Sequence, residues 1–123
     1  MGSGNRLLEL SIRFSLEIME YVELLESKRK FVIANQLLRA ATSVGANCHE
    51  AQSAESLADF IHKLKIASKE AVETEYWLKL CQASPNYPDP KNLFDMNLEL
   101  LRLLGSIITT AKKKLHLQSS SDH

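Results

Sequence analysis

The sequence has few of the residues that build turns. It contains only four glycines and three prolines among 123 residues. A multi-stranded sheet needs many tight turns, in which glycine and proline are favoured. Their scarcity argues against an all-β fold and favours long helices joined by few loops.

Cysteine and long apolar runs are also scarce. The two cysteines, Cys48 and Cys81, fall within expected helices. We predict reduced thiols packed as small apolar side chains, with a disulfide or a reactive thiol as the alternative. Charged residues interrupt every apolar stretch, so we expect no transmembrane helix. Met1 to Gly4 lack the apolar run of a signal peptide, and we therefore predict a cytoplasmic protein without membrane contact.

Neither sign of charge predominates. Lys and Arg together number 15, and Asp and Glu together also number 15. This balance disfavours a strongly basic, freestanding DNA-binding protein, but it leaves room for local basic clusters.

Apolar residues recur at helical spacing in four long segments. We expect helices over about 5–27, 30–53, 56–84 and 89–117. Ser56 with Asp59 forms a capping-box-like pair, and Asp89-Pro90 is typical of a helix start.

The matched lengths and short links of these segments predict an architecture. We expect one all-α domain, an antiparallel up-down-up-down four-helix bundle over residues 5–117. Residues 1–4 are expected to be disordered or left over from cloning, and residues 118–123 to be a flexible tail.

The fourth segment is apolar around more than half of its circumference. Because a helix in a lone bundle keeps one side wet, we expect part of this surface to meet another subunit. The alternative is a wide core stripe with a few exposed leucines. Tyr76 and Trp77 are adjacent, so at most one faces the core, and the other is expected at a subunit contact.

A polar stripe is predicted on one side of the second helix. Its members lie three or four residues apart: Gln36, Arg39, Ser43, Asn47 and Glu50. Candidate partners on the third helix are Lys69, Glu70, Glu73 and His62. The stripe is either a hydrogen-bonded network that fixes helix register or a surface for a ligand or partner.

The segment from Gln36 to Ala51, QLLRAATSVGANCHEA, carries a family resemblance. It resembles the signature of the 23S rRNA-intervening-sequence proteins, a bacterial four-helix-bundle family. A second match runs from Ala58 to Leu64 and continues to Leu78, and the resemblance spans about Leu7 to Leu115. It implies a four-helix bundle that often assembles as a cyclic pentamer and has no assigned activity. A related branch binds nucleic acid and a reverse transcriptase in diversity-generating retroelements.

Metal and catalytic motifs are weak. A di-iron bundle needs a Glu-x-x-His pair on each of two helices, and the nearest approach is Asp59 with His62. Cys48, His49 and Glu50 are adjacent and therefore point in different directions. We predict no catalytic, cofactor or metal site, with an intersubunit active site as the weakest alternative.

Two basic clusters remain. They are Lys28, Arg29 and Lys30, and Lys112, Lys113 and Lys114. Each is either a solvated charge group or a nucleic-acid contact, and antiparallel helices are expected to bring both clusters to a common end. Our first functional hypothesis is a non-enzymatic homo-oligomeric scaffold or interaction module. The alternative is an accessory protein that binds RNA or DNA in association with rRNA or a reverse transcriptase.

Overall fold

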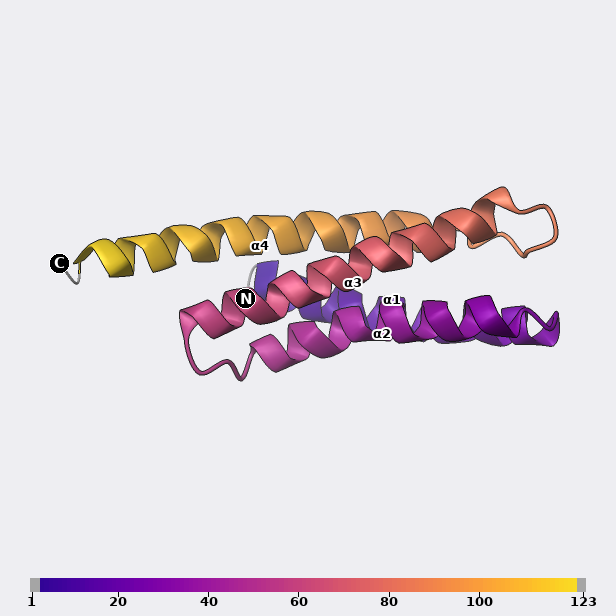
Figure 1. The fold of residues 1–123 in the computed structure, drawn as a ribbon, viewed down its shortest axis with the longest axis horizontal. Coiled ribbons are helices and arrows are strands. Elements are labelled where there is room, and N and C mark those ends of the chain that lie inside the picture. Colours follow the sequence, from indigo (N-terminus) through magenta and orange to yellow (C-terminus); the bar gives the residue numbers. More distant parts are fainter. Residues whose placement is uncertain (1–2, 122–123) are drawn as a thin grey trace.

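The structure, a computed structural model, describes residues 3–121, and it describes side chains from Arg6 to Ser120. Four helices make up this part of the chain: α1 Ser3–Ser27, α2 Phe31–Ala51, α3 Leu57–Ala83 and α4 Leu93–Ser121. They run in alternating directions (Figure 1), so the predicted all-α four-helix bundle is confirmed. Met1, Gly2 and residues 122–123 lie outside the described residues, so the predictions for them are not tested.

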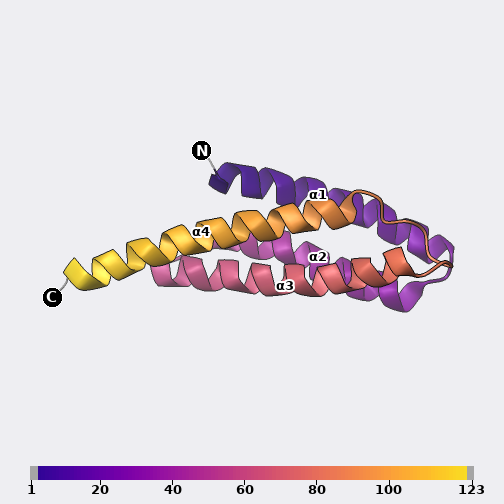
Figure 2. The ribbon, with the colours of Figure 1, turned by 90° about the horizontal axis from the view of Figure 1, so that it is seen from above.

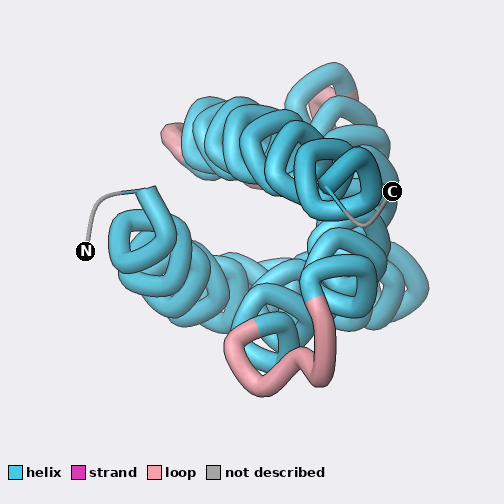
Figure 3. The backbone as a smooth tube through the Cα atoms, turned by 90° about the vertical axis from the view of Figure 1, so that its left-hand side faces the viewer, coloured by secondary structure: helices cyan, strands magenta, loops and turns pink. Residues whose placement is uncertain are grey.

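Each helix packs against the next one in sequence, and α1 also packs against α4. Within the described chain, the backbones of α1 and α3 do not approach each other closely, and neither do those of α2 and α4. Every helix contributes fully buried side chains to the central core, among them Phe14, Leu37, Leu64 and Leu100. The helices therefore occupy four corners, with α1 and α3 diagonally opposed, and α1 and α4 diverge toward the termini (Figures 2 and 3).

Local capping explains two of the predicted boundaries. The Ser56 hydroxyl accepts a hydrogen bond from the Asp59 N–H at 3.0 Å, and the Asp59 carboxylate accepts one from the Glu55 N–H at 3.2 Å. This pair begins α3 as expected. At the end of α1, Arg29 has a φ of 63°, and the Lys30 N–H bonds to the Leu25 carbonyl at 2.9 Å. The turn at Arg29 lets three residues reverse the chain.

The start of α4 differs from the prediction. Asp89-Pro90 does not begin the helix, because Lys91 has a φ of 53°, which lies outside the helical region. The Asp89 carboxylate instead accepts a hydrogen bond from the Lys91 N–H at 3.0 Å and closes a turn. α4 therefore begins at Leu93.

The other end of α4 also differs from the expected boundary. The helix continues to Ser121, whereas we expected it to end near Leu117. Residues 118–121 contain neither glycine nor proline, so nothing in their backbone chemistry forces the helix to stop. As a result the C-terminal part of α4 projects beyond the ends of the other helices (Figures 1 and 2).

The apolar surface of α4 is used within the subunit. Leu93, Met96, Leu100 and Leu104 are buried. A further set is half-buried against the core: Phe94, Leu101, Leu103, Ile107 and Ile108. The prediction that part of the apolar surface of α4 meets another subunit stays a prediction. α1 and α3 cover two sides of α4. Leu117 is its one large hydrophobic side chain that is mostly exposed among the described residues.

Candidate interaction surface

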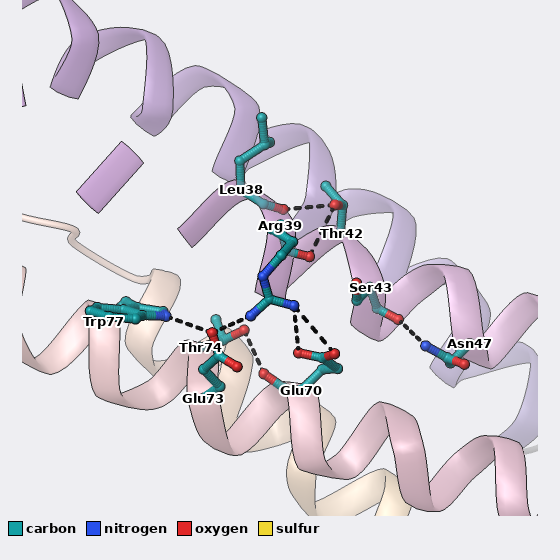
Figure 4. Close-up of polar contacts among 9 residues, drawn as sticks. All are labelled: Leu38, Arg39, Thr42, Ser43, Asn47, Glu70, Glu73, Thr74 and Trp77. Atoms are coloured by element: carbon teal, nitrogen blue, oxygen red, sulfur yellow. Dashed lines mark hydrogen bonds and ion pairs between the residues drawn. The ribbon is translucent and has the colours of Figure 1, made fainter. Parts of the chain in front are cut away.

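Arg39 joins α2 to α3 (Figure 4). Its guanidinium donates to both carboxylate oxygens of Glu70, at 3.3 and 3.4 Å, and forms an ion pair with Glu73. Glu73 also accepts a hydrogen bond from the indole N–H of Trp77 at 3.0 Å. Two of the partners proposed from the sequence, Glu70 and Glu73, are thus found beside Arg39.

The same contacts shift the protonation equilibria. The hydrogen bond from Trp77 and the ion pair with Arg39 lower the pKa of the Glu73 carboxyl, because both favour its charged form. The Glu73 carboxylate in turn raises the pKa of Arg39. The Arg39 side chain is 49% exposed, so this cluster lies at the surface of the α2–α3 contact and not in the core.

The remaining polar stripe does not continue this network. The Asn47 amide donates to the Ser43 carbonyl of its own helix at 2.9 Å. Glu50 lies 3.8 Å from the Lys63 ammonium, and Gln36 is exposed. The stripe is therefore a set of separate contacts, and only Arg39 and Glu50 reach α3 in the part of the chain with described side chains.

The two basic clusters lie at opposite ends of the bundle, so the expectation of a common end is wrong. The first links α1 to α2, whereas the second lies near the C-terminal end of α4. Three antiparallel helices, α2, α3 and α4, separate these two points along the chain, so the points lie at opposite ends of the bundle. Lys30 also lies over the Tyr87 ring, 4.8 Å from its centroid, whereas Lys112, Lys113 and Lys114 are exposed.

Seven of the ten exposed large hydrophobic side chains among the described residues lie on α1 and α3; the other three are Phe31 and Val32 on α2 and Leu117 on α4. We call Ile12, Leu16 and Met19 the α1 surface; they are 50–57% exposed. We call Val72, Tyr76 and Leu80 the α3 surface; they are 39–55% exposed. The members of each set follow at steps of three or four residues, so each set lies along one helix face.

Of the residues on these two surfaces, only Tyr76 was among those considered from the sequence for a subunit contact; the other members were not predicted, although their helical spacing is visible. α1 has apolar residues on two faces, since Phe14 and Ile18 point into the core while Ile12 and Leu16 point outward. On α3, Trp77 packs half-buried against the core and leaves Tyr76 exposed. The two rings meet edge to face with centroids 5.2 Å apart.

Among the described residues, no group of three His, Cys, Asp or Glu side chains is placed to hold a metal ion. Both cysteines are free and buried, and burial raises the pKa of the Cys48 thiol to about 12. No described helix combines the length and apolar character that a membrane span requires.

Comparison with known proteins agrees with this fold. The class is an antiparallel four-helix bundle, and residues 5–109 match the model of the 23S rRNA-intervening sequence protein family. The chain belongs to that family. It is similar to a crystal structure of a protein of unknown function from the S23 ribosomal protein family of Bacteroides thetaiotaomicron, with 40% identity and a TM-score of 0.82. The match covers 87% of this chain and 98% of that one. No curated protein matches significantly.

Proposed function

We propose that this chain is a non-enzymatic, homo-oligomeric scaffold or interaction module of the cytoplasm that needs no cofactor. The observation that carries the proposal is the pair of exposed apolar surfaces on α1 and α3. Single exposed leucines are normal on a monomer, but three aligned on one helix face are typical of a contact surface. A second copy would remove these side chains from water.

The family match and the chemistry of the described side chains support the non-enzymatic part. The family of this chain indicates no catalytic activity. The Cys48 thiol is buried and held in its protonated form near neutral pH, which makes it a poor nucleophile.

Light scattering on the purified chain tests the proposal. We expect a mass that is a multiple of the 13.9 kDa subunit, and the family resemblance implies a factor of five. A particle that stays at the subunit mass at micromolar concentration would overturn the proposed function. Circular dichroism of the same sample checks that the helices are formed.

The projecting end of α4 favours a second candidate, an accessory role in which this chain binds RNA or DNA, with or without a reverse transcriptase. Lys112, Lys113 and Lys114 are exposed on α4 shortly before that end, and an oligomer would repeat the cluster. Because phosphate affinity rises steeply with the number of contacts, a repeated cluster binds much better than a single one.

Titration against RNA and DNA at low and moderate salt tests this candidate. The two basic clusters lie at opposite ends, so they can be neutralised separately. Replacing Lys112, Lys113 and Lys114 with Gln should abolish binding, while the same change at Lys28, Arg29 and Lys30 is the matched control. Absent binding of the unmodified chain at low salt would dismiss the candidate.

A further inference from the structure

The two apolar surfaces are bordered by opposite charges. Beside the α1 surface lie three exposed glutamates: Glu9, Glu20 and Glu23. Beside the α3 surface lie three exposed lysines: Lys65, Lys69 and Lys79. Glu23 follows Met19 by four residues and Lys79 follows Tyr76 by three, so each charge shares a helix face with its apolar neighbour.

Four of these charges are not neutralised within the subunit. Glu20, Glu23, Lys65 and Lys79 have no ion-pair partner among the residues whose side chains are described. By contrast, Arg13 is occupied by Glu17 on its own helix, at 3.4 Å. The α1 surface therefore has an acidic border and the α3 surface a basic one.

The two borders match in length. One runs from Glu9 to Glu23 and the other from Lys65 to Lys79, and each covers about 21 Å of helix at 1.5 Å per residue. α1 and α3 lie at diagonal corners of the bundle, and their exposed apolar surfaces lie on the outside of it. One subunit can therefore use both surfaces at once, toward two different neighbours.

The α1 surface also has a recess beside it. A groove of about 230 Å³ lies between α1 and α2, with Ile12 and Leu16 on one side and Ala46 and His49 on the other. Gly45 also lines the groove, and it has no side chain to fill it. On the α3 surface, Tyr76 is the largest side chain, and 55% of it is exposed.

We propose that the α1 surface of one copy of this chain binds the α3 surface of the next copy, with Tyr76 entering the groove between α1 and α2. Glutamates then face lysines along the border. The contact joins two different surfaces and is therefore heterologous, so each copy leaves one surface free for a further copy, and the series either closes into a ring or extends. This inference rests on the proposed homo-oligomeric function.

Charge reversal tests the pairing. Glu20→Lys with Glu23→Lys should convert the assembly to single subunits, and Lys65→Glu with Lys79→Glu should do the same, because like charges then face each other. Combining all four changes in one chain again gives the two borders opposite net charges, with the signs exchanged, so its mass should return to that of the unmodified assembly. The matched controls are Glu55→Lys and Arg102→Glu, exposed charges outside both surfaces, which should leave the mass unchanged.

Filling the groove tests the place of Tyr76. Ala46 is exposed at the groove, so Ala46→Trp should block assembly while the subunit stays helical by circular dichroism. Tyr76→Ala should weaken assembly in the same way.

The outcomes separate the two proposals. If the unmodified chain is a single subunit, the proposed function fails, and this pairing fails with it. If the unmodified chain assembles but either charge-reversed pair keeps the assembled mass, the pairing alone is wrong. A four-fold variant that stays at the subunit mass also overturns it, since restored complementarity is the specific expectation. An Ala46→Trp variant that assembles normally contradicts the docking of Tyr76.

Discussion

The carboxamide nitrogen of Asn97 in α4 donates a hydrogen bond to the backbone carbonyl oxygen of Ala71 in α3, 2.9 Å away in the bundle interior. Asn97 is fully buried, and its oxygen Oδ1 has no hydrogen-bond partner in the described chain. The contact favours one register between the two helices. The unpaired oxygen opposes it, because a buried unsatisfied polar group costs about 1–3 kcal/mol.

Replacing Asn97 with Leu should raise the free energy of unfolding by about 1 kcal/mol, since the unpaired oxygen is removed and a side chain of similar size remains. The Ala71 carbonyl lies inside α3, where the regular helix pattern also supplies it with a backbone donor. Urea denaturation at a fixed protein concentration measures the change. A lower stability would show that the hydrogen bond to Ala71 outweighs the unpaired oxygen.

Trp77 should report the protonation of Glu73. It is the only tryptophan, and its indole donates to the Glu73 carboxylate. An acid titration of its fluorescence should show a transition with a midpoint below the ordinary glutamate pKa of about 4.3. Glu73→Gln should remove the transition, and Arg39→Gln should move its midpoint upward, because the ion pair that helps to lower the pKa is lost.

The lowered pKa of Glu73 also determines the direction in which stability changes with pH. The charged Glu73 contributes stability above its unfolded-state pKa, and the contribution is lost as the pH falls through the lower folded-state pKa. The thermal midpoint of the unmodified chain should therefore fall more steeply on acidification than that of Arg39→Gln. Equal slopes would mean that Arg39 does not act on this carboxyl.

Tyr21 ties α1 to the loop between α3 and α4. Its hydroxyl donates to the Pro88 carbonyl at 2.6 Å, and burial raises its pKa. Tyr21→Phe should lower the free energy of unfolding at pH 7 by about 1 kcal/mol, the typical contribution of one hydrogen bond. The folded state keeps the Tyr21 proton above pH 10, where the unfolded state loses it, so stability falls with rising pH.

The loss of stability at alkaline pH provides a second measurement on Tyr21. The phenylalanine variant should lose less stability than the unmodified chain between about pH 10 and 11, because it has one fewer proton to release on unfolding. Denaturation curves at these pH values and at pH 7 give the difference. An unchanged alkaline slope would indicate that Tyr21 ionises as readily in the folded chain as in the unfolded one.

Local signals in the sequence were sufficient for the helices and for part of the surface. Helical spacing predicted the four helices, and Ser56 with Asp59 predicted the start of α3. Glu70 and Glu73, two of the expected partners, do contact Arg39. These features depend on residues close in sequence or on one pair of adjacent helices. They follow from propensity and charge.

Features that depend on the packing of several helices could not be predicted from such local signals. Asn97 is a single polar residue in an apolar helix, and nothing local shows that it faces Ala71. The burial of the α4 leucines depends on how widely α1 and α3 cover them. Lys91 adopts a left-handed conformation without being glycine, so the start of α4 was placed too early.

Gly45 in α2 and Gly105 in α4 give a final, matched comparison. A Cβ at Gly105 would meet no atom within 4 Å, whereas one at Gly45 would lie 3.4 Å from the Ser15 hydroxyl oxygen and 3.6 Å from the Ser11 backbone carbonyl oxygen. Alanine fits both sites, so each Gly→Ala change should stabilise the chain by about 1 kcal/mol through helix propensity. Isoleucine, in contrast, should affect stability differently at the two positions.

Gly105→Ile should remain close to neutral, because its side chain extends into open space. Gly45→Ile places a branched side chain against the backbone of α1, which cannot rotate away, and should destabilise the chain by about 1–3 kcal/mol. Urea denaturation of all four variants at one protein concentration gives the comparison. Equal effects of isoleucine at the two positions would show that the close approach of α1 and α2 at Gly45 does not constrain the bundle.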